Sequence, residues 1–195
     1  DADGDLDCFV ACHSVHSAGS YRDTSLTRKY DPLAADRLFR NEGNGKFTDV
    51  SRVYGIYGGT AGYALGLVVS DVNGDGRPDV YIGNDFHEND YLYLNRDGKR
   101  FEETAAKSFG HQSNFTMGCD VADVNNDGRA DLVSLDMKPP SETLLKASQP
   151  VDAYDVFTFK HSQGYHWQFP RNNLQLNRGQ APDGDYPLFS EIGQL

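Results

Sequence analysis

An all-β fold, a β-propeller segment of about three four-stranded blades, is predicted by three features of the 195-residue sequence. An aspartate-rich loop is repeated, a hairpin-like element follows each copy, and the copies are spaced by roughly 50 residues. A sandwich would not repeat its strands so regularly, so the blades of a propeller are the better match. The predicted repeats cover residues 1–60, 61–112 and 113–195 of one partial domain.

The repeated loop runs from Asp71 to Asp79 and recurs in the same frame from Asp123 to Asp131. The sequence opens with a shorter copy that lacks the first two positions. Calcium is a hard cation that takes about six to eight oxygen ligands, and side chains at alternate positions of a tight turn can converge on one point. The loops therefore predict Ca²⁺ as the cofactor.

Each predicted calcium site combines side-chain oxygens of aspartate and asparagine with one backbone carbonyl, and a glycine allows the turn. The carbonyls are those of the two arginines and, in the shorter copy, of its third aspartate. The predicted ligands are Asp71, Asn73, Asp75, Arg77 and Asp79; Asp123, Asn125, Asp127, Arg129 and Asp131; and Asp1, Asp3, Asp5 and Asp7.

An EF-hand and a simple turn are the two alternatives to this kind of calcium loop. An EF-hand opens in the same way but needs a bidentate Glu at its twelfth position, where this sequence has Ile82 and Ser134, and its flanks are helices. Runs of Asp, Asn and Gly can also be simple turn formers. Two intact copies in one frame favour metal binding over turn formation.

The element after each loop contains a strand that ends in asparagine, at Asn41, Asn95 and Asn177, followed by a turn and a second strand. Two units are longer than the other. Their predicted insertions, near residues 13–35 and 137–171, are richer in Ser, Pro, Lys and His than the strands. We expect both to be loops on one face of the disc.

Composition excludes several functions. Acidic residues outnumber basic ones by 29 to 18, and the net charge of −11 would repel a phosphate backbone, so nucleic acid is not an expected partner. No run approaches the roughly 18 apolar residues of a membrane span. The triplet from Asn114 to Thr116 matches a glycosylation acceptor, a pattern that is common by chance.

The cysteines form no complete disulfide framework, because their number is odd. Cys8, Cys12 and the adjacent His13 are similar to a haem-attachment motif with one extra residue. In a β-strand, however, the two cysteines would lie about 13 Å apart, which is too far for a bridge.

The second insertion contains the only tryptophan together with other aromatics and an arginine. Such a stretch can stack on a sugar or anchor a protein partner. The alternative is a β-strand in which Trp167 and Phe169 pack into the blade. The predicted ligand-binding residues are Tyr165, His166, Trp167, Gln168, Phe169 and Arg171.

These repeats resemble the FG-GAP or VCBS repeats of integrin-α-like propellers. The stretches DVYIGNDFHENDYLYLN, DRLFRNEGNGKFTDVS and RNNLQLNRG resemble the cartilage acidic protein and ASPIC/UnbV-associated group more closely. The resemblance implies a propeller of about seven blades with calcium in its loops, so that the three blades form an open arc with flanking blades in a longer protein. Cys12 departs from the asparagine that the family often has.

The resemblance also implies a secreted, cell-surface or periplasmic protein that binds a protein or glycan ligand and is not an enzyme. Two alternatives remain open, a calcium-dependent polysaccharide lyase and a purely structural spacer. No nucleophile elbow, HExxH or Walker loop is present. A lyase would need a base and a charge stabiliser in one cleft, and His166 with Arg171 is an example of such a pair.

Overall fold

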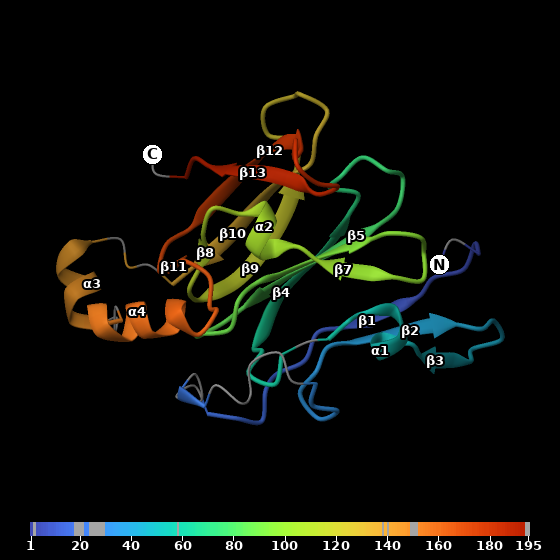
Figure 1. Ribbon diagram of the computed structural model, residues 1–195, viewed down its shortest axis with the longest axis horizontal. Coiled ribbons are helices and arrows are strands. Elements are labelled where there is room, and N and C mark those ends of the chain that lie inside the picture. The colour runs from blue at the N-terminus through green and yellow to red at the C-terminus, as the bar shows by residue number, and fades with distance from the viewer. Residues whose placement is uncertain are drawn as a thin grey trace.

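The computed structural model describes residues 1, 3–17, 22–23, 30–57, 59–137, 139, 141–148 and 152–193. Parts of both predicted insertions lie outside these residues. Three antiparallel sheets follow one another along the chain and around the molecule (Figure 1). No helix in the described part of the chain is long and apolar enough to cross a membrane.

Each sheet is a meander in which neighbouring strands are joined in sequence order. The first contains β1 (Cys8–Val10), β2 (Arg37–Asn41) and β3 (Phe47–Asp49). The second contains β4 (Ala64–Ser70), β5 (Asp79–Asn84), β6 (Tyr91–Asn95) and β7 (Phe101–Glu103). The third contains β9 (Thr116–Ala122), β10 (Asp131–Asp136), β12 (Asn173–Gln180) and β13 (Pro187–Glu191). The predicted arc of propeller-type blades is confirmed.

The first sheet departs from the prediction of four strands per blade, because it has three among the described residues. Each of the other two sheets has one strand more, β4 or β9, and this additional strand directly precedes the aspartate-rich loop. The first copy of the loop begins at Asp1, so the described residues contain no strand in front of it.

The middle sheet is buried on both faces, since its central strands β5 and β6 are buried at every position. Side chains of a strand alternate between faces. Ile82 and Tyr93 accordingly pack toward the first sheet, whereas Tyr81 and Leu92 pack toward the third. This two-sided packing explains why DVYIGN and YLYLN are apolar without the alternation of a half-exposed strand.

Small residues let the second and third sheets approach closely. A Cβ on Gly66 of β4 would lie 2.8 Å from the Cys119 sulfur of β9, and a Cβ on Gly83 of β5 would overlap the Thr116 side chain. Since real Cβ atoms do not come so near, glycine is needed at both positions for this packing.

The second insertion is partly helical, which corrects the expectation of loops. Besides the short helices α1 (Ser51–Tyr54) and α2 (Ala105–Ser108), the chain forms α3 (Glu142–Ser148) and α4 (Tyr154–Ser162). A parallel pair, β8 (Gln112–Ser113) and β11 (Gln168–Phe169), lies beside them. The α4 sequence has no clear apolar stripe; contacts of Phe157 and Lys160 with the rest of the chain hold it instead.

Candidate functional site

The loop between β4 and β5 is wrapped around its first aspartate. The Asp71 carboxylate accepts hydrogen bonds from the backbone N–H groups of Gly74 (2.8 Å), Asp75 (3.1 Å) and Gly76 (2.7 Å). Gly76 has a φ of 84°, in the left-handed region that glycine adopts without a Cβ penalty. The sequence thus forms this turn with its own side chains and backbone.

The loop between β9 and β10 repeats the arrangement. Asp123 accepts hydrogen bonds from the N–H groups of Asp127 (3.0 Å) and Gly128 (2.8 Å), and Gly128 has a φ of 83°. Asn125 accepts from the N–H of Asp127 at 3.1 Å, as Asn73 does from its counterpart. Strands, not helices, flank both loops, which agrees with the prediction that neither is an EF-hand.

The last aspartate joins each loop to the strand beyond it, and it is buried in the two complete loops. Asp79 accepts hydrogen bonds from the N–H groups of Val72 (3.0 Å) and Asn95 (2.8 Å). Asp131 makes the equivalent bonds to Val124 (3.0 Å) and Asn177 (2.8 Å), and Asp7 accepts from Asn41 at 2.9 Å. The repeated asparagines of the sequence therefore mark where these carboxylates hold the following strand, at the ends of β2 and β6 and within β12, which continues to Gln180.

Burial raises the pKa of Asp79 to about 6, although its two backbone hydrogen bonds oppose the shift. The negative charges of Asp75 and Asp71 raise it further. The three carboxylates of this loop therefore lie near enough to repel one another, and a bound cation would relieve that repulsion.

Arginine side chains also contact the predicted ligands. Arg77 forms an ion pair with Asp75 at 2.6 Å and donates from Nε to the Asn95 carbonyl at 2.9 Å; Arg129 pairs with Asp127 at 2.7 Å. No group of three or more His, Cys, Asp or Glu side chains in the described residues is arranged to hold a metal ion. The donor chemistry, all oxygen, suits calcium, but guanidinium and amide groups engage these oxygens here.

The first copy of the loop is looser. Asp3 and Asp5 are exposed, and the Asp5 N–H donates to the Asp3 carboxylate at 3.2 Å. The Asp1 amine lies 2.8 Å from the Asp7 carboxylate. Of the four predicted ligands in this copy, Asp7 alone makes the bond to the following strand that the complete loops share.

A second repeated bond, not anticipated from the sequence, holds the opposite end of each sheet. A side-chain oxygen of the residue directly before β2, β6 or β12 accepts the backbone N–H of the residue five positions after the last loop aspartate. The pairs are Asp36 with Cys12 (2.8 Å), Asp90 with Asn84 (2.7 Å) and Asn172 with Asp136 (2.8 Å). Because Cys12 donates through its backbone, its departure from the family's asparagine leaves this bond intact.

Two of these acceptors are buried carboxylates. Burial raises the pKa of Asp90 to about 7, against its hydrogen bonds from Tyr81, Asn84 and Thr116. Burial likewise raises the pKa of Asp36 to about 6. Each of the three acceptors lies five positions before one of the repeated asparagines, Asn41, Asn95 and Asn177, and that spacing was the sequence signal that could have identified them.

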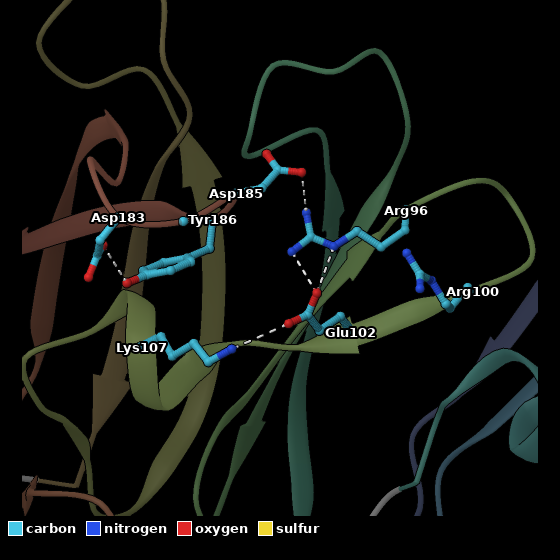
Figure 2. Close-up of a pocket in the computed structure, with 8 residues that line it drawn as sticks. Arg96, Arg100, Glu102, Lys107, Asp183, Asp185 and Tyr186 are labelled. Atoms are coloured by element: carbon cyan, nitrogen blue, oxygen red, sulfur yellow. Dashed lines mark hydrogen bonds and ion pairs between the residues drawn. The ribbon is translucent and has the colours of Figure 1, made fainter.

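A polar groove lies at the end of the sheets that carries the aspartate-rich loops, between the turn after β6 and the turn after β12 (Figure 2). It encloses about 530 Å³ and contains both signs of charge. Figure 2 shows Arg96 directed toward Glu102 and Asp185, with Lys107 also reaching Glu102 and the Tyr186 hydroxyl donating to Asp183. Its lining residues are Arg96, Arg100, Glu102, Lys107, Asp183, Gly184, Asp185 and Tyr186. These contacts neutralise most of its charge.

The predicted ligand-binding stretch divides into inward and outward residues. Tyr165 and Gln168 are buried, each 4% exposed, whereas Trp167 and Phe169 are 38% and 39% exposed. The exposure of Trp167 and Phe169 does not match the alternative in which these two side chains pack into the blade, whereas Tyr165 and Gln168 belong to the interior.

The other two predicted ligand-binding residues face the chain. His166 Nε2 lies 2.8 Å from the Phe109 carbonyl, and Arg171 contacts Glu191 (2.6 Å) and His111 Nε2 (2.7 Å). Burial lowers the pKa of His166. His166 and Arg171 are thus held by different partners, which gives no support to them as a catalytic pair.

Successive antiparallel sheets, joined to aspartate-rich loops at one end, define the chain as a segment of a β-propeller. Residues 1–82 and 71–134 match the FG-GAP-like repeat, and the chain belongs to that family. Repeats of this family are typically extracellular binding or structural modules rather than enzymes. No curated protein matches the chain.

Proposed function

We propose that this chain is a calcium-stabilised binding module of a larger propeller, in which the loops 71–79 and 123–131 each hold one Ca²⁺. The observation that carries the proposal is the shared geometry of the two loops, in which Asp71 and Asp123 both accept backbone hydrogen bonds from the residues four and five positions later. Loops that served only as turns would not need the same polar residues at every alternate position.

In the first complete loop, the candidate ligands are the side chains of Asp71, Asn73, Asp75 and Asp79 and the carbonyl of Arg77. A bound calcium ion would supply positive charge among carboxylates that otherwise repel one another. Arg77 supplies part of that charge through its ion pair with Asp75, so its guanidinium competes with the metal for this carboxylate. The role of the metal is structural, because the loop lies between two strands of one sheet.

The test is a thermal melt with calcium and with a chelator. A ligand that binds only the folded state adds about 2.7 kcal/mol when present at a hundredfold excess over Kd. Titration calorimetry should find two main sites, and Asp75→Ala and Asp127→Ala should each remove one. Asp97→Ala, which changes a turn aspartate outside both loops, is the control and should retain both. Equal melting temperatures with calcium and chelator would refute the proposal.

The family and the acidic surface support a role in binding outside the cell, with a protein or a glycan as the ligand and a secreted, cell-surface or periplasmic location. A sheet edge with unpaired backbone groups invites another strand. The strand β1, whose described neighbour is β2 alone, is such an edge. We expect flanking blades to complete the ring in the full protein. The test is to extend the chain at either end and to measure its size in solution, which should show one compact monomer.

A further inference from the structure

A small pocket lies at the second insertion, where Figure 1 places α4 and β11 at the end of the molecule away from the aspartate-rich loops. We call it the insertion pocket. Its volume is about 270 Å³, close to the lower limit of ligand pockets, which suits one ring and not an extended ligand. Its lining residues are Asn114, Asp152, Tyr154, Phe157, Gln168, Phe169 and Pro170.

Aromatic rings form most of the wall. Phe157 of α4 and Phe169 of β11 have ring centroids 5.9 Å apart, and Tyr154 stands at the rim with 82% of its surface exposed. Phe157 also packs against Trp167 at 5.4 Å, and Trp167 stacks on His161 at 3.7 Å. Phe157 and Phe169 are therefore held by neighbouring rings, whereas Tyr154 is exposed at the rim, and the wall still offers surface to a ligand.

A polar side chain that lines the pocket has one atom without a partner within the described part of the chain. Gln168 is 4% exposed, and its Nε2 donates to the Glu88 carbonyl at 2.8 Å. Its Oε1 is buried and has no hydrogen-bond partner among the described residues. Most buried polar side-chain atoms are hydrogen-bonded, so this oxygen calls for a donor from outside the chain.

The charges beside the pocket neutralise each other. Lys160 is buried, and its Nζ donates to Asn114 Oδ1 at 3.2 Å and to Asp152 at 3.0 Å. With this ion pair closed, the described residues of the wall offer no free charge to select an anion or a cation. The same contacts leave Asn114 only 6% exposed, so the glycosylation triplet of the sequence is inaccessible in the fold.

We propose that the insertion pocket binds one neutral sugar ring of a glycan. The apolar C–H face of a sugar packs on aromatic rings, and a turn of the Gln168 side chain toward the ring brings its buried Oε1 to a sugar hydroxyl, which donates to it. The closed ion pair of Lys160 and Asp152 disfavours uronates and basic peptides. This inference rests on the proposed binding function and specifies its ligand as a glycan.

The 195-residue chain contains its own reporter, because Trp167 is its only tryptophan and adjoins the pocket through Phe157. The calcium-saturated protein is titrated with methyl glycosides of glucose, galactose, mannose, fucose and N-acetylglucosamine, up to about 100 mM, where even millimolar affinity saturates. At least one should change the tryptophan emission saturably. Glucuronate and octaproline are the charged and peptide comparisons and should not.

Tyr154→Ala is the first variant, since this exposed side chain can be removed without disturbing the fold, and it should weaken binding about tenfold or more. Phe169→Ala should weaken it similarly. Phe47→Ala is the matched control, an aromatic residue 47% exposed on β3, and should bind as the parent does. Unchanged melting temperatures would show that these variants fold.

The proposal is overturned if no glycoside changes the emission, if Tyr154→Ala and Phe169→Ala bind as well as Phe47→Ala, or if glucuronate or octaproline alone binds. Repeating the titration with chelator separates this failure from that of the calcium proposal. If sugar still binds but calcium has no effect on the melting temperature, the proposal of calcium sites is refuted and the proposal of a sugar site in the insertion pocket stands.

Discussion

Removal of the Asp79 carboxylate should destabilise the fold even without calcium. Asp79 is 1% exposed and accepts two backbone N–H groups, from Val72 at 3.0 Å and from Asn95 at 2.8 Å. Asp79→Ala leaves both donors without their acceptor. Hydrogen bonds to charged groups contribute about 1.5–3 kcal/mol each, so the expected loss of unfolding free energy is about 3–6 kcal/mol. In a protein of this size, that lowers the Tm by at least about 6 °C.

The assay is chemical and thermal unfolding in the presence of a chelator, which removes any metal contribution. Asp75→Ala is the matched control, because this aspartate belongs to the same loop but is exposed, and its change should be within about 0.5 kcal/mol. If Asp79→Ala is no more destabilised than Asp75→Ala in chelator, then the buried carboxylate does not hold the loop to β6, and the structural role assigned to it is wrong.

Two further predictions concern the interior. The pKa of Asp90 in the fold, about 7, lies above its value in an unfolded chain. The contribution of Asp90 to the free energy of unfolding is therefore complete below about pH 4 and is lost as the pH rises through 7. The largest loss is about 4 kcal/mol. The stability of Asp90→Asn relative to the parent should therefore increase between pH 5 and pH 8 in denaturant titrations, and a constant difference would contradict this. Gly83→Ala should cost about 1–3 kcal/mol by overlap with Thr116, and Thr116→Ser should recover part of it; equal losses in the single and double variants would show that the overlap is not the cause.

The repeats were predictable because they depend on residues that are close together in the sequence. Aspartate and asparagine at alternate positions, with glycine at the left-handed position, form the same turn wherever they occur. Asp71 and Asp123 therefore both accept the N–H groups of the residues four and five positions later in the two complete loops. The apolar runs of β5 and β6 similarly indicated strands that are buried on both faces.

The second insertion was less predictable. Its composition suggested a loop, but α4 forms there because Phe157 packs on Trp167 and Phe169. In addition, Lys160 donates hydrogen bonds to Asn114 and Asp152. Those partners lie elsewhere in the chain, and local propensity contains no information about them. The same contacts decided which residues of the predicted recognition stretch face outward.

By itself, the sequence determined the all-β repeat architecture, the boundaries of the two complete loops and their oxygen-rich donor set, because each depends on residues within about ten positions of one another. Tertiary structure alone decided that Asp79 and Asp131 turn inward to the following strands, that Asp90 is buried, and that Gln168 faces an aromatic pocket with its Oε1 unpaired among the described residues. Burial and long-range hydrogen bonds arise only when distant strands meet, so a repeated spacing can mark such positions but not their burial or their partners.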